Sequence, residues 1–194
     1  MSAVLDATRM HTELATPLGT VTLVRHGERL AGLYFEHHWY RPAESTFGQR
    51  TEDGFEEIST QLAEYFTGHR RTFRVPMLLM GSPAQMAVWR HLQHIPYGQT
   101  TTYGAIGREV GLRLSAQQIG KLVGQNPLCI LIPCHHVVAA NGNLLGYAGG
   151  RRRQGALLDL ELSVAGQQSL FPAPSLSEED RRDRVQGPFM APPL

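Results

Sequence analysis

The chain of 194 residues is long enough for one sizeable domain or two small ones. Its 42% hydrophobic and 18% charged residues are typical of an ordinary soluble protein, and its longest apolar runs are too short to span a membrane. The N-terminus lacks the basic and apolar segments of a secretory signal, and the two cysteines, Cys129 and Cys134, do not make a disulfide framework. We therefore expect a cytoplasmic protein with reduced thiols.

Charged residues are unevenly distributed along the chain. Residues 87–153 contain seven basic side chains and one acidic side chain, whereas residues 1–86 contain eight and ten, and residues 154–194 contain three and six. A basic segment between acidic ones suits a surface that binds phosphates. The alternative is a solvated face that happens to be basic.

The first part of the chain has the pattern of a short antiparallel sheet. Residues 1–11 show no period and are expected to form a loose end, and the β pattern starts at Thr12. Alternating apolar residues predict strands over 20–24 and 30–35, joined by a turn at 26–29.

A helix and an extended segment are expected after this sheet. Apolar residues at helical spacing predict a helix over 55–66 that ends at Gly68, and residues 71–79 return to an extended pattern. Four histidines have irregular spacing and no accompanying cysteine, so we interpret them as surface residues rather than metal ligands: His11, His26, His37 and His38.

The basic segment has the pattern of several short helices. Ser82 and Pro83 predict the start of a helix that runs to Leu92. Thr102 can cap a helix over 103–110, and Ser115, with glutamine three residues later, is a capping-box signal for the next one. Two short helices joined by a glycine-containing turn are a helix-turn-helix candidate, although many helical hairpins bind nothing.

The apolar run 128–131 leads into Ile132-Pro133-Cys134-His135-His136, which places a thiol next to an imidazole. A cysteine becomes a strong nucleophile as a thiolate, and a nearby base or cation favours that form. The alternative is a buried structural cysteine beside surface histidines. Beyond this stretch we expect a turn at 139–143, a flexible loop at 146–150 and a last helix from Arg151 to Leu162, and then a disordered tail.

The region from Trp89 to Glu161 resembles the C-terminal domain of the O6-alkylguanine-DNA alkyltransferases, also called methylated-DNA–protein-cysteine methyltransferases. The matching pieces, in chain order, are Val88-Trp89, Ile95-Pro96-Tyr97-Gly98, Thr102-Tyr103, Gly124-Gln125-Asn126-Pro127, Ile130-Leu131-Ile132-Pro133-Cys134-His135, Val137-Val138, Gly146-Tyr147-Ala148-Gly149-Gly150 and Leu157-Leu158 with Glu161. The preceding sheet and helix look like that family's smaller domain.

The resemblance implies an α+β fold. Residues 1–80 would form a small N-terminal domain with an antiparallel sheet and a helix. Residues 81–166 would form a mostly helical DNA-binding and alkyl-transfer domain, and residues 167–194 a disordered tail. The resemblance implies a single-turnover DNA repair protein. Such a protein binds duplex DNA containing O6-alkylguanine, flips the base out and moves the alkyl group irreversibly onto Cys134. O4-alkylthymine is a further candidate substrate.

The resemblance also implies roles for individual residues. The catalytic set is Cys134, His135, Glu161, Asn126 and Tyr103. Within it, His135 activates the thiol through a water, Glu161 orients His135, Asn126 organises the turn and Tyr103 gives a proton to N3 of guanine. The substrate pocket is formed by Val137, Tyr147, Ala148, Trp89 and Cys129. Contact with DNA is implied for Thr102, Tyr103, Ser115, Ala116, Gln117, Gly120, Lys121, Gly124 and Arg151.

Two positions depart from the family pattern. Gln117 stands where family members usually carry an arginine that fills the gap left by the flipped base, and an amide lacks the charge and stacking of a guanidinium. His136 stands where an arginine usually follows the Cys-His pair, so stability or DNA binding can become pH-dependent.

We expect no metal, no cofactor and no membrane partner, and a monomer that can cluster on DNA. The main alternative is an alkyltransferase-like protein, which senses alkylated guanine without transfer; such proteins lack the acceptor cysteine, and Cys134 is present here. A Cys-His hydrolase lacks supporting motifs in this sequence. A transcription factor would need more base-reading groups in its recognition helix.

Overall fold

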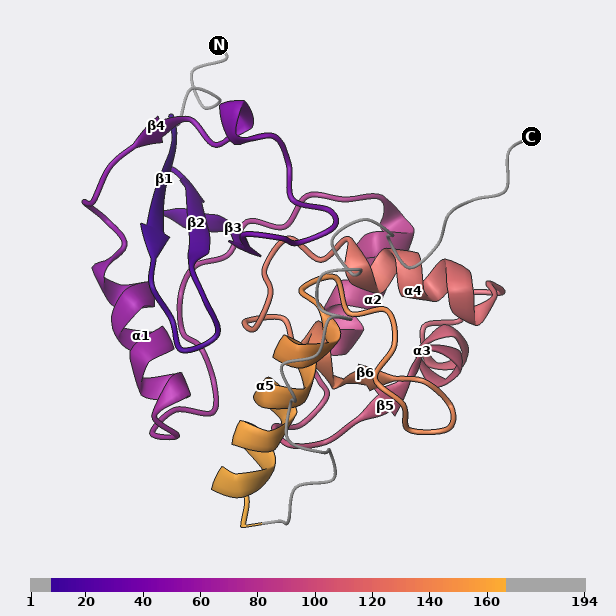
Figure 1. Cartoon of the computed structure of the whole chain (residues 1–194). Coiled ribbons are helices and arrows are strands. Elements are labelled where there is room, and N and C mark those ends of the chain that lie inside the picture. Colours follow the sequence, from indigo (N-terminus) through magenta and orange to yellow (C-terminus); the bar gives the residue numbers. More distant parts are fainter. Residues whose placement is uncertain (1–7, 167–194) are drawn as a thin grey trace.

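The computed structural model describes residues 8–166, in which a small sheet and one helix are followed by a mainly helical part (Figure 1). The strands are β1 (Arg9–Leu14), β2 (Val21–His26), β3 (Arg29–Phe35) and β4 (Gln49–Arg50), in the order β3-β2-β1-β4. The first three strands pair antiparallel and β4 pairs parallel with β1. The expected α+β class is confirmed. The expected disordered tail, 167–194, lies outside the described residues.

Two expectations about the N-terminal part were wrong. Residues 9–11 are not a loose end, because β1 starts at Arg9 and pairs with β2 along its whole length. His11 and His38 are not surface residues, since both are buried. The ring of His11 contacts Phe47, and the ring of His38 lies edge-on to Tyr34.

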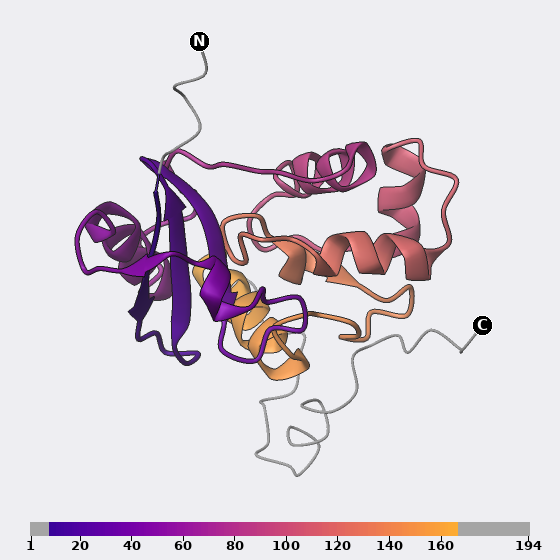
Figure 2. The ribbon, with the colours of Figure 1, turned by 90° about the horizontal axis from the view of Figure 1, so that it is seen from above.

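Helix α1 (Glu56–Phe66) covers one side of the sheet, on the far side from α2, α3 and α4 (Figure 2). Its buried face carries residues at helical spacing: Ile58, Gln61, Leu62 and Tyr65. The segment expected to be extended at 71–79 forms no regular strand and is held by a single bridge between Met77 and Leu30. A short 3-10 helix, η1 (Glu44–Thr46), lies in the loop before β4.

The C-terminal part contains the expected helices, and hydroxyl caps start three of them. Helix α2 (Pro83–Leu92) begins with a capping box at Ser82, α3 (Tyr103–Glu109) is capped by Thr102, and α4 (Ala116–Gly124) begins with a capping box at Ser115. Each cap satisfies a backbone N–H that would lack an intrahelical partner. Helix α5 (Arg151–Val164) ends the described chain.

A short parallel ladder brings two distant segments of this part together. Strand β5 (Thr101–Thr102) pairs with β6 (Val137–Val138), which follows the 3-10 helix η2 (Cys134–His136). The N-terminal end of α3 therefore lies next to the Cys-His stretch.

The sheet and the helical part share one hydrophobic core. Leu33 at the edge of β3 bonds through its backbone to the segment before the cysteine stretch: its N–H donates to the Pro127 carbonyl at 2.8 Å, and its carbonyl accepts from the Cys129 N–H at 3.2 Å. The N-terminal sheet thus supports the chain that carries the candidate nucleophile. None of the helices in the described part of the chain combines the length and the apolar character that crossing a membrane requires.

Candidate active site

Cys134 begins the turn of η2 and is only 3% exposed. The Asn126 amide donates to the Cys134 sulfur at 3.1 Å and to the Ile132 carbonyl at 2.8 Å. The amide oxygen of Asn126 accepts from the Leu128 N–H at 3.0 Å. One buried side chain therefore holds both the turn and the thiol, which is the role expected for Asn126.

The chain reverses sharply just before the nucleophile. Ile130 has a φ of 72°, which a β-branched residue rarely adopts. Hydrogen bonds from the Ile132 N–H to the Leu128 carbonyl and from the Leu131 N–H to the Cys129 carbonyl, both at 2.9 Å, maintain this turn. Such a conformation costs about 1–3 kcal/mol and persists only where the surroundings impose it.

The environment of Cys134 favours its thiolate form. Hydrogen bonding to Cys129 and from the Asn126 amide lowers the pKa of Cys134 below its ordinary value, although burial acts in the opposite direction. The contact with Cys134, together with burial, raises the pKa of Cys129 well above its ordinary value. Of the two buried thiols, Cys134 is thus the one that ionises more readily.

Glu161 on α5 is the centre of a buried hydrogen-bond network. Its Oε1 contacts His135 Nε2 at 2.9 Å and accepts from the Tyr65 hydroxyl at 2.6 Å. Its Oε2 contacts His136 Nε2 at 2.7 Å and accepts from the Gly98 N–H at 2.7 Å. Two donors for each oxygen satisfy the carboxylate away from water.

The network assigns the protonation states of its members. Although burial would raise the pKa of Glu161, the hydrogen bonds from His135 and His136 lower it below its usual range, so the carboxylate is ionised. Burial and the neighbouring His136 lower the pKa of His135 to about 4, so that ring is neutral at neutral pH. Since an ionised carboxylate only accepts, His135 Nε2 carries the proton and Nδ1 carries the free lone pair.

The basic nitrogen of His135 has no partner within the described residues. His135 Nδ1 is buried and makes no hydrogen bond there, and no direct bond joins this ring to the Cys134 sulfur. Such an unpartnered buried nitrogen is where a bridging water would bind. The arrangement therefore fits the expectation that the two groups communicate through a water.

The residues expected to line the substrate pocket lie on four segments: α2, the run before η2, β6 and the loop before α5. Val137, Tyr147 and Ala148 are buried, and the Tyr147 side chain interacts with the Cys129 thiol. The Val137 carbonyl accepts from Gln154 Nε2 at 2.9 Å and keeps a second lone pair. Trp89 serves helix packing, because its indole N–H donates to the Leu122 carbonyl at 2.8 Å.

Tyr103 stands at the start of α3 and is tied to the loop after β6. Its hydroxyl donates to the Leu145 carbonyl at 2.5 Å. Burial and the nearby charge of Cys134 raise the pKa of Tyr103 to about 12, so the hydroxyl keeps its proton at neutral pH. To donate that proton to a substrate, Tyr103 must leave the Leu145 carbonyl.

The residues expected to contact DNA divide between the two sides of α4. The exposed ones are Ser115, Ala116, Gln117 and Lys121, joined by Arg151 at the start of α5, and Thr102 is half-buried. Gly120 and Gly124 are buried, because they share the inward side of α4 with Ile119 and Val123. A Cβ on Gly124 would lie 2.9 Å from the Tyr40 ring, so this glycine serves close packing.

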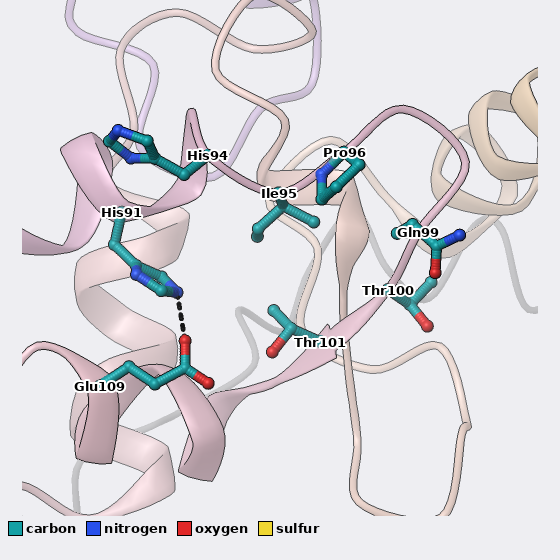
Figure 3. A pocket seen from close by; sticks show the side chains of 8 residues that line it. All are labelled: His91, His94, Ile95, Pro96, Gln99, Thr100, Thr101 and Glu109. Atoms are coloured by element: carbon teal, nitrogen blue, oxygen red, sulfur yellow. Dashed lines mark ion pairs between the residues drawn. The ribbon is translucent and has the colours of Figure 1, made fainter.

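A surface pocket of about 470 Å³ opens elsewhere, between α2 and α3 (Figure 3). Figure 3 shows His91 facing Glu109 at its edge, at 3.0 Å between Nε2 and Oε2. The pocket includes none of the residues expected at the site.

His135, His136 and Glu161 form a group whose ligand atoms lie within 4.8 Å of one another, as a metal site would require. Two features disfavour a metal here. The carboxylate oxygens already accept from Tyr65 and Gly98, and the Nδ1 atoms of both histidines lack the acceptors that orient metal-bound imidazoles. We interpret the group as a hydrogen-bonded network.

Sequence reasoning did not find the further donors to Glu161. The Tyr65 hydroxyl comes from α1, 96 residues away in the chain, and the Gly98 N–H comes from the turn after α2. His136 was noted as a departure from a pattern, but its contact with Glu161 was not expected. No local signal in the sequence marks these contacts.

Two family models match the chain almost end to end over the described residues. The ribonuclease-like domain of 6-O-methylguanine DNA methyltransferase matches residues 10–79, and the DNA binding domain of 6-O-methylguanine DNA methyltransferase matches residues 83–163.

Curated relatives and solved structures agree with these matches. The methylated-DNA–protein-cysteine methyltransferase of Mycobacterium bovis is 39% identical over 150 residues, covering 77% of this chain and 90% of the relative. The constitutive enzyme of that name from Bacillus subtilis is 34% identical, covering 76% and 92%. The crystal structure of Mycobacterium tuberculosis OGT in complex with DNA aligns with a TM-score of 0.76 at 36% identity, over 80% of this chain and 94% of that one.

Proposed function

The chain belongs to the 6-O-methylguanine DNA methyltransferase family, and we propose that Cys134 is the residue that receives the alkyl group. The family membership makes it a DNA repair enzyme that transfers an alkyl group from methylated DNA to a protein cysteine. One observation carries the assignment: Cys134 is the thiol that the Asn126 amide contacts, and the adjacent His135 bonds the buried carboxylate of Glu161.

In the proposed reaction the Cys134 thiolate attacks the carbon attached to O6 of guanine. The C–S bond forms as the C–O bond breaks, and the electron pair stays on the guanine. His135 Nδ1 takes the thiol proton through a water, and Glu161 stabilises the resulting imidazolium. The product is a thioether, which no group in the site can cleave, so each molecule reacts once.

Guanine leaves more readily when it gains a proton. We propose that the Tyr103 hydroxyl supplies it at N3, after exchanging the Leu145 carbonyl for the substrate. We propose that the Tyr147 hydroxyl and the Ala148 N–H donate to O6, and that the Val137 and Cys134 carbonyls accept from the exocyclic amine. The burial of Cys134 supports base flipping, because a stacked base cannot reach this thiol.

The exposed face of α4 is the proposed DNA-contacting surface, with Gln117 and Lys121 as its polar groups. Gln117 would hydrogen-bond the base left without a partner. We further propose that the lesion is O6-alkylguanine, with O4-alkylthymine as a second substrate, that the protein acts as a monomer, and that a domain boundary lies near residue 80. The meeting of the two family models between residues 79 and 83 supports that boundary.

The test is intact mass after incubation with a duplex that contains one O6-methylguanine. We expect the wild-type protein to gain one methyl group, and we expect no gain with Cys134→Ala or with an unmodified duplex. Tight binding of the damaged duplex by wild type without a gain in mass would refute transfer. That result would favour lesion sensing without transfer, which is the alternative suggested by the departures from the family pattern at Gln117 and His136.

A further inference from the structure

A second thiol lies next to the proposed acceptor. Cys129 is fully buried and belongs to the same core as Cys134, and the interaction between the two thiols shifts the pKa of each. Both cysteines are free. The alkyl-transfer reaction needs one thiol, and the mechanism above gives Cys129 no covalent role.

The backbone holds this pair in place from both sides. The reversal at Ile130 folds the chain between the two cysteines back on itself. The Cys129 N–H bonds to Leu33 on β3, while the Asn126 amide contacts Cys134 Sγ at 3.1 Å and the Leu128 carbonyl at 3.4 Å. A fixed turn therefore lies between the two cysteines, and the pKa of each thiol responds to the other across it.

We propose that Cys129 is a resolving thiol, which converts an oxidised Cys134 into an intramolecular Cys129–Cys134 disulfide when a peroxide reaches the site. This inference depends on the proposed function only in taking Cys134 as the acceptor. The oxidant is a hydroperoxide, which is smaller than the base that the proposed reaction brings to Cys134.

The chemistry balances in two steps. The Cys134 thiolate attacks one peroxide oxygen, giving the sulfenic acid Cys134–SOH and releasing hydroxide. The Cys129 sulfur then attacks the sulfenic sulfur, the S–O bond breaks, and the Cys129 proton leaves with the hydroxyl as water. A dithiol reductant reverses the product by thiol–disulfide exchange.

The different acidities of the two thiols suit these roles. Cys134 is the more readily ionised sulfur and reacts first, while Cys129 remains protonated beside it. Without Cys129, a sulfenic acid would proceed to sulfinic acid, which ordinary reductants do not reverse. The pair therefore protects a protein whose acceptor can be used only once.

The experiment treats the reduced full chain with equimolar hydrogen peroxide and measures intact mass before and after dithiothreitol. Wild type is expected to lose two hydrogens and to become inert to iodoacetamide after denaturation. Both cysteines lie in the tryptic peptide Leu122–Arg151, so the bond appears as an intact peptide lacking two hydrogens, with suppressed fragmentation between them. Dithiothreitol is expected to restore both the mass and most of the lost methyl transfer.

The matched variants are Cys129→Ser and Cys129→Ala, each compared with its own reduced activity. Both are expected to gain one or two oxygens at Cys134 and to recover much less transfer than wild type. Oxygen addition in wild type, a disulfide that links two chains, or equal recovery in the variants would each overturn the proposal. Methyl transfer by the untreated protein tests the function separately, so failure of one proposal is distinguishable from failure of the other.

Discussion

The Tyr65 hydroxyl is the contact by which helix α1 takes part in the proposed site, and Tyr65→Phe removes only its oxygen. That hydroxyl donates at 2.6 Å to Glu161, and both residues are 1% exposed. Hydrogen bonds to charged groups contribute about 1.5–3 kcal/mol, and water cannot readily replace this donor, so we expect a destabilisation of about 2 kcal/mol.

The variant should also change the response to acid. Because Glu161 has a lowered pKa when folded, its contribution to stability is present above its unfolded pKa and is lost as pH falls through the folded pKa. Loss of a donor raises the folded pKa of Glu161. The acid-induced loss of stability should therefore be smaller in Tyr65→Phe than in wild type, and it should level off at a higher pH.

Urea unfolding between pH 2 and 8 measures both effects, and Tyr97→Phe is the matched control. The Tyr97 ring lies edge-on to Tyr65 at 6.1 Å, and its buried hydroxyl has no hydrogen-bond partner within the described residues. Removing it should cost little or be neutral. If Tyr65→Phe costs less than about 0.5 kcal/mol, or no more than Tyr97→Phe, the inference that α1 supports Glu161 is refuted.

Three further predictions follow from single residues. Burial lowers the pKa of His38 and His135 to about 4, so the free energy of unfolding should fall as pH drops from 6.5 to 4. In that range His38→Asn should reduce the slope of this free energy against pH by the equivalent of about one proton. An unchanged slope would contradict this. His136→Leu removes the neighbouring ring that helps to lower the pKa of His135, so this pKa should rise above about 4 in an NMR titration; a lower value would argue against the shared network. Gln117→Arg should tighten duplex binding and steepen the salt dependence of the affinity by about one released ion. Gln117→Leu should weaken binding without changing that salt dependence. A salt dependence that the arginine leaves unaltered would place Gln117 away from the phosphates.

Local signals predicted the elements well, because the relevant interactions are themselves local. Hydroxyl caps at Ser82, Thr102 and Ser115 each bond a backbone N–H three residues later, and each helix starts where its cap predicts. Apolar spacing likewise located α1. The β pattern missed the start of β1 at Arg9, since pairing with β2 rather than alternation determines that end.

The environment of the site could be predicted only in part. Cys134 and His135 could be identified because they are neighbours in the sequence. The partners of Glu161 could not, because they depend on how α1 and the turn at Gly98 pack against α5. The contact between Cys129 and Cys134 depends on a positive φ at Ile130, which no rule would assign to isoleucine. Long-range packing and an imposed backbone conformation leave no periodic trace in a sequence.

The backbone bonds of Leu33 have a consequence for how the protein unfolds. Through these bonds the segment before Cys134 pairs with β3 at a short β-bridge and so extends the N-terminal sheet. Peeling β3 away would leave the Cys129 N–H without its acceptor inside a core that water does not enter. We therefore expect the two regions matched by the family models to unfold together, in one cooperative transition, under heat or denaturant.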